Sequence, residues 1–395
     1  MPANEDKPRA EGLARFLLAL SMLLAPCVYV ARLALAEPVT APRSSRPLWA
    51  NTLLLTVGRW PTPARLPEGP SFAALSSSGI DLAGLFAASD RPGPAAVSLL
   101  TGRFVLNHGV ASPDQSLPPG AWTLASSALE SGARTAAFLQ ADFVSRHGIG
   151  GFETAREAPD VSLADLAAQA GDWLAAHAGE RRFLWLHAER PGQGGAELEA
   201  ALGQLWSRLG ERKEQFQTLT VFTALAGPER GEPDLGLRVP LRLQLPNGVN
   251  ARRRAEVLLS QVDLAGTLRE LLRLPGPSRA RGQAALQSRS ESGYQALEGA
   301  DVQEPLWIDG SFGSLARWPD LRAVARPTSP GAAPALDLFR LPRWNAGPEA
   351  AEPLASGERS AAEDRFWRLR SRLLEGATSA VPSGAAASGA VPSGD

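Results

Sequence analysis

The chain has 395 residues, of which 44% are hydrophobic and 21% charged, and its net charge is −1. This length is enough for one large α/β domain or two smaller ones, and the composition is that of a globular protein. Because the charges nearly cancel, a general electrostatic attraction to nucleic acid is excluded, and we expect no nucleic-acid partner.

The N-terminus has the features of an export signal. A basic segment precedes an apolar run over residues 16–30, and an Ala-x-Ala cleavage site ends at Ala36. A retained membrane anchor is the second interpretation, because residues 16–36 are about long enough to span a bilayer. Both interpretations predict an exported protein, either periplasmic or extracellular, or anchored to the membrane and facing outwards. We assign residues 1–36 to the signal peptide or membrane anchor, and the Pro- and Arg-rich residues 37–50 to a linker.

The single cysteine, Cys27, lies inside this N-terminal apolar run. The folded part of the chain therefore has neither an internal disulfide nor a cysteine nucleophile. Any hydrolytic chemistry in the body of the chain has to come from other side chains.

The body of the chain alternates short apolar runs typical of buried strands with segments of helical periodicity. This alternation predicts a largely parallel sheet with helices on both faces. The strands are expected at 51–57, 134–139, 183–187, 218–223 and 237–243, and the helices at 71–78, 94–102, 122–131, 162–177, 196–209 and 260–273.

The C-terminal part is less regular. It ends in an amphipathic helix over 361–374, whose Phe366, Trp367, Leu369 and Leu373 are expected to share one face. The tail, residues 376–395, repeats Ala-Val-Pro-Ser-Gly and has too little apolar content to form a core, so we predict that it is disordered.

A series of short motifs follows one another along the chain. They are Asn51-Thr-Leu-Leu-Leu-Thr-Val57, Ser98-Leu-Leu-Thr-Gly-Arg103, His108-Gly-Val110, Gly132-Ala-Arg-Thr-Ala136, Phe183-Leu-Trp-Leu-His187, Thr220-Val-Phe-Thr223, Arg238-Val-Pro-Leu241, Ser260-Gln-Val-Asp-Leu264 and Ala335-Leu-Asp-Leu-Phe339. In order and spacing they resemble the sulfatase family of the alkaline phosphatase superfamily. The resemblance implies an alkaline-phosphatase-like α/β domain over 51–275 and a smaller C-terminal sulfatase-like subdomain over 276–375.

The same resemblance assigns the catalytic positions. Active sulfatases carry Cys-x-Pro-Ser-Arg before this Ser-Leu-Leu-Thr-Gly-Arg segment, and the cysteine becomes the formylglycine that attacks sulfur. Counting back from Ser98, the cysteine falls on Pro92 and the arginine on Ala96, and neither residue can supply or orient a nucleophile. The family also uses a divalent cation such as calcium. The positions matching its metal ligands and the nearby lysine and histidine are Gly58, Gln140, Gly192, Leu225 and Ala226.

There is an electrostatic reason why all of these ligands would be lost together. A cation offsets the repulsion and desolvation of the carboxylates around it, so losing one ligand alone would strand the others in a cleft. The sequence therefore predicts a catalytically inactive, sulfatase-like exported protein without metal or cofactor, which binds a ligand or partner. The alternatives are a divergent sulfuric-ester or phosphoric-ester hydrolase with relocated residues, and a structural envelope protein.

Arg103 and His108 are retained within the resembling motifs. Arg103 is a candidate for binding a sulfate or phosphate group at the N-terminus of the helix over 94–102, where the helix dipole and the guanidinium could act together. His108 is the second candidate of this anion site, although a structural hydrogen bond is favoured for it. The expected ligand is a sulfated or phosphorylated glycan, and a protein partner is the alternative.

Other polar residues have structural explanations. Ser89 and Asp90 are candidates for a displaced nucleophile, but we expect them to turn the chain into the following helix. His187 lies in an apolar strand and is interpreted as a hydrogen-bonded core histidine. His147 is placed in a loop and shows no metal-ligand spacing.

Overall fold

The structure is a computed structural model, in which the described residues all belong to one compact unit. The signal peptide or anchor, the linker, Gly192 and the tail beyond residue 378 lie outside the described residues. Within the described part, no helix combines the length and the hydropathy needed to cross a bilayer. The described residues are 51–60, 68–189, 195–211, 214–228, 237–246, 253–276, 286–290, 293–296, 306–310, 313–317, 321–326, 328, 334–341 and 352–378.

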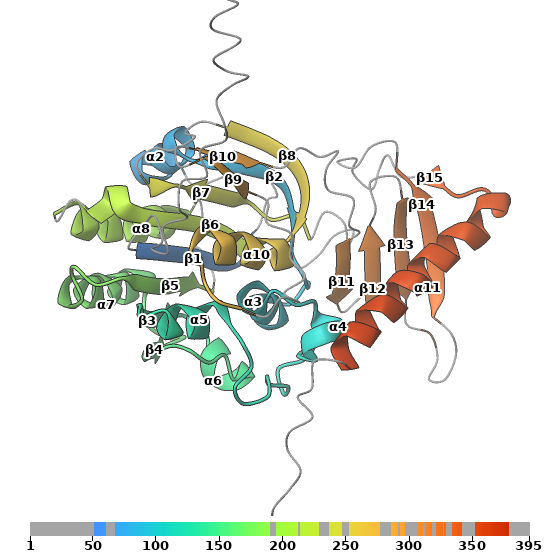
Figure 1. Cartoon of the computed structure of the whole chain (residues 1–395), viewed down its shortest axis with the longest axis horizontal. Coiled ribbons are helices and arrows are strands. Elements are labelled where there is room, and N and C mark those ends of the chain that lie inside the picture. Colours follow the sequence, from blue (N-terminus) through green and yellow to red (C-terminus); the bar gives the residue numbers. More distant parts are fainter. Residues whose placement is uncertain are drawn as a thin grey trace, which may run out of the picture. The chain divides into compact units, whose positions relative to one another are not determined.

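An eight-stranded sheet forms the centre of the unit (Figure 1), in the order β4-β3-β5-β1-β6-β7-β2-β8. Its middle strands β5, β1 and β6 are buried almost throughout, as expected of parallel strands covered on both faces. The strands are β1 (Asn51–Arg59), β2 (Ile80–Phe86), β3 (Arg134–Leu139), β4 (Thr154–Glu157), β5 (Arg182–Ala188), β6 (Thr218–Ala226), β7 (Leu241–Gln244) and β8 (Arg253–Ser260).

The pairing is parallel except at β7, which runs antiparallel to both of its neighbours, β6 and β2. The predicted largely parallel sheet is thus confirmed, and the strand expected at 237–243 is shorter and reversed in direction. Strands β2, β4 and β8 were missed, because β4 and β8 are rich in Arg and Glu and β2 contains Asp and Gly.

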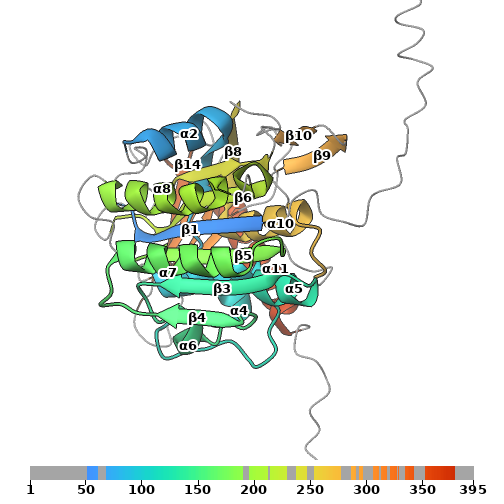
Figure 2. The same cartoon turned by 90° about the vertical axis from the view of Figure 1, so that its left-hand side faces the viewer.

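Helices cover both faces of this sheet, as predicted. Figure 2 shows α2, α7 and α8 side by side in front of the central strands, and α3, α5 and α10 pack together on the opposite face. Their bounds are α2 (Pro70–Ser78), α3 (Pro92–Thr101), α5 (Leu124–Glu130), α7 (Leu163–Ala176), α8 (Ala196–Gly210) and α10 (Gln261–Leu271), and the short turns are α4 (Val105–His108), α6 (Phe143–His147) and the 3₁₀ helix η2 (Glu214–Gln217).

Helix α3 starts two residues earlier than the sequence predicts, on a Pro-Gly-Pro segment. Pro92 is its first residue and Pro94 its third, so neither ring removes an intrahelical hydrogen bond, because the first N–H groups of a helix have no partner within it. The helix ends at Gly102, whose φ of 63° is in the left-handed region that glycine favours.

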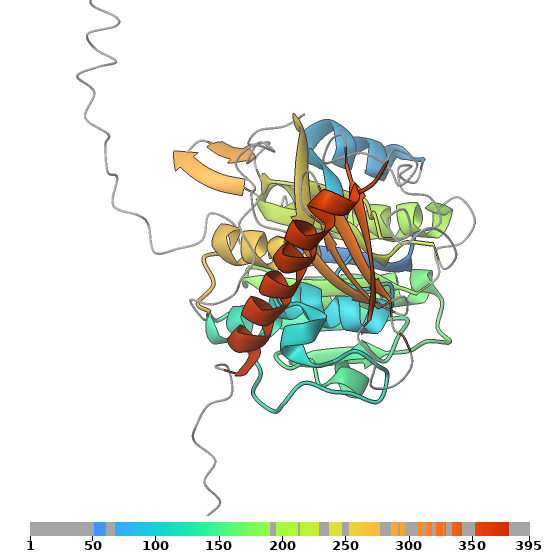
Figure 3. The ribbon, with the colours of Figure 1, turned by 90° about the vertical axis from the view of Figure 1, so that its right-hand side faces the viewer.

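The C-terminal part is more regular than the sequence predicts. A five-stranded antiparallel sheet, β11-β12-β13-β14-β15, packs against the long helix α11, which lies in front of the strands in Figure 3. The elements are the hairpin β9 (Leu286–Ser290) and β10 (Gly293–Ala296), then β11 (Leu306–Gly310), β12 (Gly313–Arg317), β13 (Leu321–Arg326), β14 (Ala335–Arg340), β15 (Glu352–Pro353) and α11 (Ser356–Thr378).

Helix α11 is longer than expected and continues past residue 376, where the tail was predicted to begin. Phe366, Leu369 and Leu373 are buried in the core beneath it, as predicted. Trp367 was expected on the same face, and this is wrong, because its side chain is 37% exposed. At 3.6 residues per turn, adjacent residues lie about 100° apart around a helix, which turns Trp367 away from Phe366.

Candidate functional site

The candidate site is the edge of the sheet where β1, β5 and β6 end, since ligands of open α/β sheets bind beyond the carboxyl ends of parallel strands. Gln261, at the start of α10, fixes this edge. Its buried amide group donates to the carbonyl oxygens of Ala224 and Leu225 at 2.8 and 3.0 Å, and its Oε1 accepts from the Ala88 N–H at 2.9 Å. Through Gln261, the segment that leads into α3 is thereby hydrogen-bonded to the end of β6.

Gly58 lies near the end of β1, where the resemblance places a metal-binding aspartate. A Cβ atom on Gly58 would lie 2.6 Å from the backbone oxygen of Glu189 and 3.0 Å from its Oε2. Glu189, which follows β5, therefore occupies the space that a side chain at position 58 would need. The sequence reasoning missed Glu189, because no motif of the resemblance points to it.

Of the other positions assigned to ligands, those that the structure describes offer no suitable donors. Leu225 and Ala226 are fully buried. The Gln140 amide donates to the Val161 carbonyl oxygen at 2.8 Å. Within the described residues, no group of three His, Cys, Asp or Glu side chains is arranged to hold a metal ion. A calcium ion prefers several carboxylate and carbonyl oxygens, and this donor set does not fit it.

The N-terminus of α3 offers little to an anion. Pro92 and Pro94 have no N–H group, and the Ala95 N–H donates to the Arg91 carbonyl oxygen at 3.1 Å. Only the Gly93 N–H is left among the first N–H groups that normally bind an anion at a helix N-terminus.

The structure does not place Arg103 at the N-terminus of α3, where the sequence analysis put its anion site. Arg103 follows Gly102, the C-cap of α3, and so lies beyond the C-terminal end of the helix. Ten helical residues span about 15 Å. The Arg103 backbone and the expected anion site are therefore at opposite ends of α3.

His108 makes the structural hydrogen bonds that the sequence analysis favours. Its Nδ1 accepts from the Val110 N–H at 3.0 Å, so Nε2 carries the proton and donates to Ser98 Oγ at 2.9 Å. Burial, with smaller effects of Arg103 and His147, lowers the pKa of His108 to about 3. A neutral imidazole adds no positive charge to an anion site, and a protonated Nε2 cannot activate Ser98 as a nucleophile.

His187 is a hydrogen-bonded core histidine, as predicted. Trp185 Nε1 donates to Thr56 Oγ1 at 2.8 Å. Because His187 Nε2 faces a carboxylate and carries the proton of the neutral ring, Nδ1 accepts from the Thr56 hydroxyl at 2.9 Å. His187 Nε2 then donates to Glu189 Oε2 at 3.1 Å. Burial lowers the pKa of His187 against the opposing effect of Glu189.

Thr56, His187 and Glu189 are the residue types of a catalytic triad of nucleophile, base and acid, but they are not arranged as one. Thr56 and His187 are fully buried, whereas the side chain of Glu189 is 40% exposed. In a working triad the nucleophile faces the substrate and the acid lies behind the histidine. Here the order is reversed, and the exposed group is a carboxylate.

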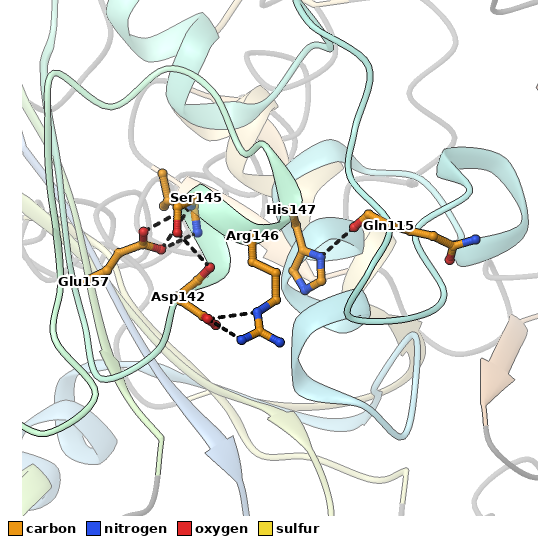
Figure 4. A network of polar contacts seen from close by, with 7 residues as sticks. Gln115, Asp142, Ser145, Arg146, His147 and Glu157 are labelled. Atoms are coloured by element: carbon orange, nitrogen blue, oxygen red, sulfur yellow. Dashed lines mark hydrogen bonds and ion pairs between the residues drawn. The ribbon is translucent and has the colours of Figure 1, made fainter.

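His147 lies beside the start of α3, at the end of helix α6 and not in a loop as expected. The Glu157 carboxylate caps α6 by accepting from the N–H groups of Val144 and Ser145 (Figure 4). His147 Nδ1 donates to the Gln115 carbonyl oxygen at 2.9 Å, and its ring is turned towards Gln115, away from Glu157.

The His147 ring also contacts the start of α3. A Cβ atom on Gly93 would overlap His147 Nε2, so the imidazole fills the space beside the second residue of the helix. Ser89, the candidate for a displaced nucleophile, is buried and accepts from the Arg91 N–H at 3.3 Å, which is the expected turn into α3.

Comparison with solved structures identifies the fold. The phosphonate monoester hydrolase of Agrobacterium radiobacter is 16% identical, with a TM-score of 0.64 over 83% of this chain and 96% of that protein. An alkaline phosphatase superfamily protein from Vibrio parahaemolyticus is 14% identical, with a TM-score of 0.60 over 85% of this chain and 88% of the other. The chain has an alkaline-phosphatase-like sulfatase fold. A protein solved with its substrate D-glucosamine-2-N,6-O-disulfate shares this sulfatase fold, at 12% identity and a TM-score of 0.66 over 85% of this chain and 99% of that one. No family model and no curated protein matches the sequence.

Proposed function

We propose that this chain is an exported sulfatase-fold protein that does not hydrolyse esters and acts by binding a ligand or partner. The observation that carries the proposal is Pro92 at the first position of α3, where the resemblance puts the formylglycine. A pyrrolidine ring has neither a nucleophilic atom nor an N–H group for an anionic transition state.

The surroundings of this position support the same function. Glu189 fills the space beside Gly58, Gln261 ties down the end of β6, and His147 fills the space beside Gly93. Within the described residues, Glu189, Gln261 and His147 are thus packed against or bonded to the protein, and this supports a site that works without a metal ion.

One observation favours relocated hydrolysis as a second candidate function. Glu189 is a half-exposed carboxylate at the carboxyl end of β5, held in place by the His187 Nε2–H. A carboxylate in this position can act as a general base towards a bound water.

Assays of the purified chain separate the two functions. We expect no turnover of p-nitrophenyl sulfate, p-nitrophenyl phosphate or a phosphonate monoester above buffer, with or without added calcium. Pro92→Cys, coexpressed with a formylglycine-generating enzyme, should also be inactive, since Ala96 cannot orient a formylglycine. Turnover by the natural chain that Glu189→Gln abolishes would instead establish the second function. Mass spectrometry of the mature N-terminus tests export and distinguishes a cleaved signal peptide from a retained anchor.

A further inference from the structure

Trp367 is the large apolar side chain that α11 leaves exposed on its outer face. The edge of its ring packs against the buried Phe366 ring, with the centroids 5.0 Å apart, and Phe366 in turn packs on Trp307 at 5.1 Å. Because the helix beneath it is anchored in the core, Trp367 is a fixed flat surface that loses little side-chain entropy when a ligand covers it.

Arginine side chains surround Trp367. Positions 365, 368, 370 and 372 are all arginine, and no acidic residue lies between 365 and 374. Arg368 is exposed and, within the described residues, has no hydrogen bond or ion pair. Ser371 follows Trp367 by four residues and Arg368 by three, so it is next to both on the helix surface, and all three side chains line the same hollow.

These side chains border a hollow of about 750 Å³, which is lined by Asp364, Arg365, Trp367, Arg368, Leu369, Ser371 and Arg372. The lining combines a planar aromatic ring, which suits the apolar face of a sugar ring, with guanidinium groups, which suit sulfate or phosphate. The charge and the shape thus favour an anionic carbohydrate.

A membrane surface is disfavoured as the partner. A helix that lies on a bilayer inserts its apolar face, but the apolar face of α11 is already buried against the C-terminal sheet. Among the described side chains of α11, Trp367 is the one large apolar side chain that the outer face offers for insertion.

We propose that the outer face of α11 binds an anionic carbohydrate, with a sugar ring stacked on Trp367 and a sulfate or phosphate group on Arg368. This site is separate from the carboxyl edge of the central sheet. The test of carbohydrate binding is therefore independent of whether the chain hydrolyses esters.

Isothermal titration calorimetry on the full chain tests the site. We expect a heparin hexasaccharide to bind, with an affinity that falls as salt rises, and uncharged isomaltohexaose not to bind. A phosphorylated mannose oligosaccharide of equal length decides between sulfate and phosphate. Trp367→Ala and Arg368→Ala should each weaken binding by about tenfold or more, as expected when an aromatic or arginine anchor is truncated.

Two matched variants control for general effects. Leu129→Ala removes the other exposed large apolar side chain in the described part, which is 38% exposed on α5, and Arg156→Ala removes an exposed arginine on β4. Neither should change the affinity. Unchanged binding by Trp367→Ala and Arg368→Ala, equal losses in the control variants, or binding to anionic lipid vesicles but not to the sugar would overturn the proposal.

Discussion

The imidazole ring of His147 lies directly against Gly93, the second residue of α3. The ring is held by its Nδ1 hydrogen bond to Gln115 and by stacking on Phe143, with ring centroids 6.3 Å apart. Phe143 also contacts the ring of His187, at 4.9 Å. The start of α3 is thereby linked to the buried hydrogen-bond chain at the end of β5.

Gly93→Ala should destabilise the protein, because the new methyl group overlaps His147 Nε2. Alanine normally stabilises a helix relative to glycine, so a loss of about 1–3 kcal/mol identifies the overlap as the cause. Urea unfolding measures it. In a double-mutant cycle, His147→Ala should recover most of the loss caused by Gly93→Ala, and purely additive effects would contradict this account.

Gly58→Asp, which restores the carboxylate expected from the resemblance, should lower stability and should not create a metal site. Its Cβ would meet Glu189, and its charge would lie beside a second carboxylate. We expect a loss of about 1–3 kcal/mol. Gly150→Ala is the matched control, because a Cβ there meets nothing within 4 Å. A calcium-dependent rise in the melting temperature of Gly58→Asp would show that the edge can still hold a cation.

Thr56→Val tests the buried chain between Trp185 and Glu189. Valine has nearly the shape of threonine but leaves Trp185 Nε1 without an acceptor and His187 Nδ1 without a donor. Each unpaired buried group costs about 1–3 kcal/mol, and urea unfolding should show a loss of that order. Thr52→Val is a control on the same strand, because Thr52 is buried but lies outside this chain. Equal losses of unfolding free energy in Thr56→Val and Thr52→Val would argue that the hydrogen bonds of Thr56 do not contribute to stability.

His108 should make stability depend on pH. Its pKa in the folded protein is about 3, below the usual 6.5, so below pH 6.5 the unfolded chain binds a proton that the native state does not. Stability should therefore fall as pH decreases from 6.5 towards 3, by up to about 1.4 kcal/mol per pH unit for this residue. Urea unfolding of His108→Gln at several pH values should give a shallower slope than the natural chain. The slope contributed by His187 should remain.

The sequence predicts the central sheet well and the site poorly, for separable reasons. The strands β1, β3, β5 and β6 are largely apolar because both faces are covered, and such runs are conspicuous in a sequence. The strands of the C-terminal sheet are short and mix polar with apolar residues, so their pattern is weak. The residues of the site were predicted from motif spacing, which assigns Pro92 and Gly58 to positions along the chain but says nothing of what fills the space beside them. Glu189 and His147 reach that space from other parts of the chain.

The packing beside Gly58 and Gly93 also sets a rule for engineering. Glu189 holds the volume that a metal-binding side chain at position 58 would need, and His147 fills the space at Gly93, next to the Pro92 position. Restoring a side chain at position 58 alone therefore costs stability, because Glu189 has to leave in the same step. A designer who wants a working hydrolase on this backbone has to exchange residues in pairs.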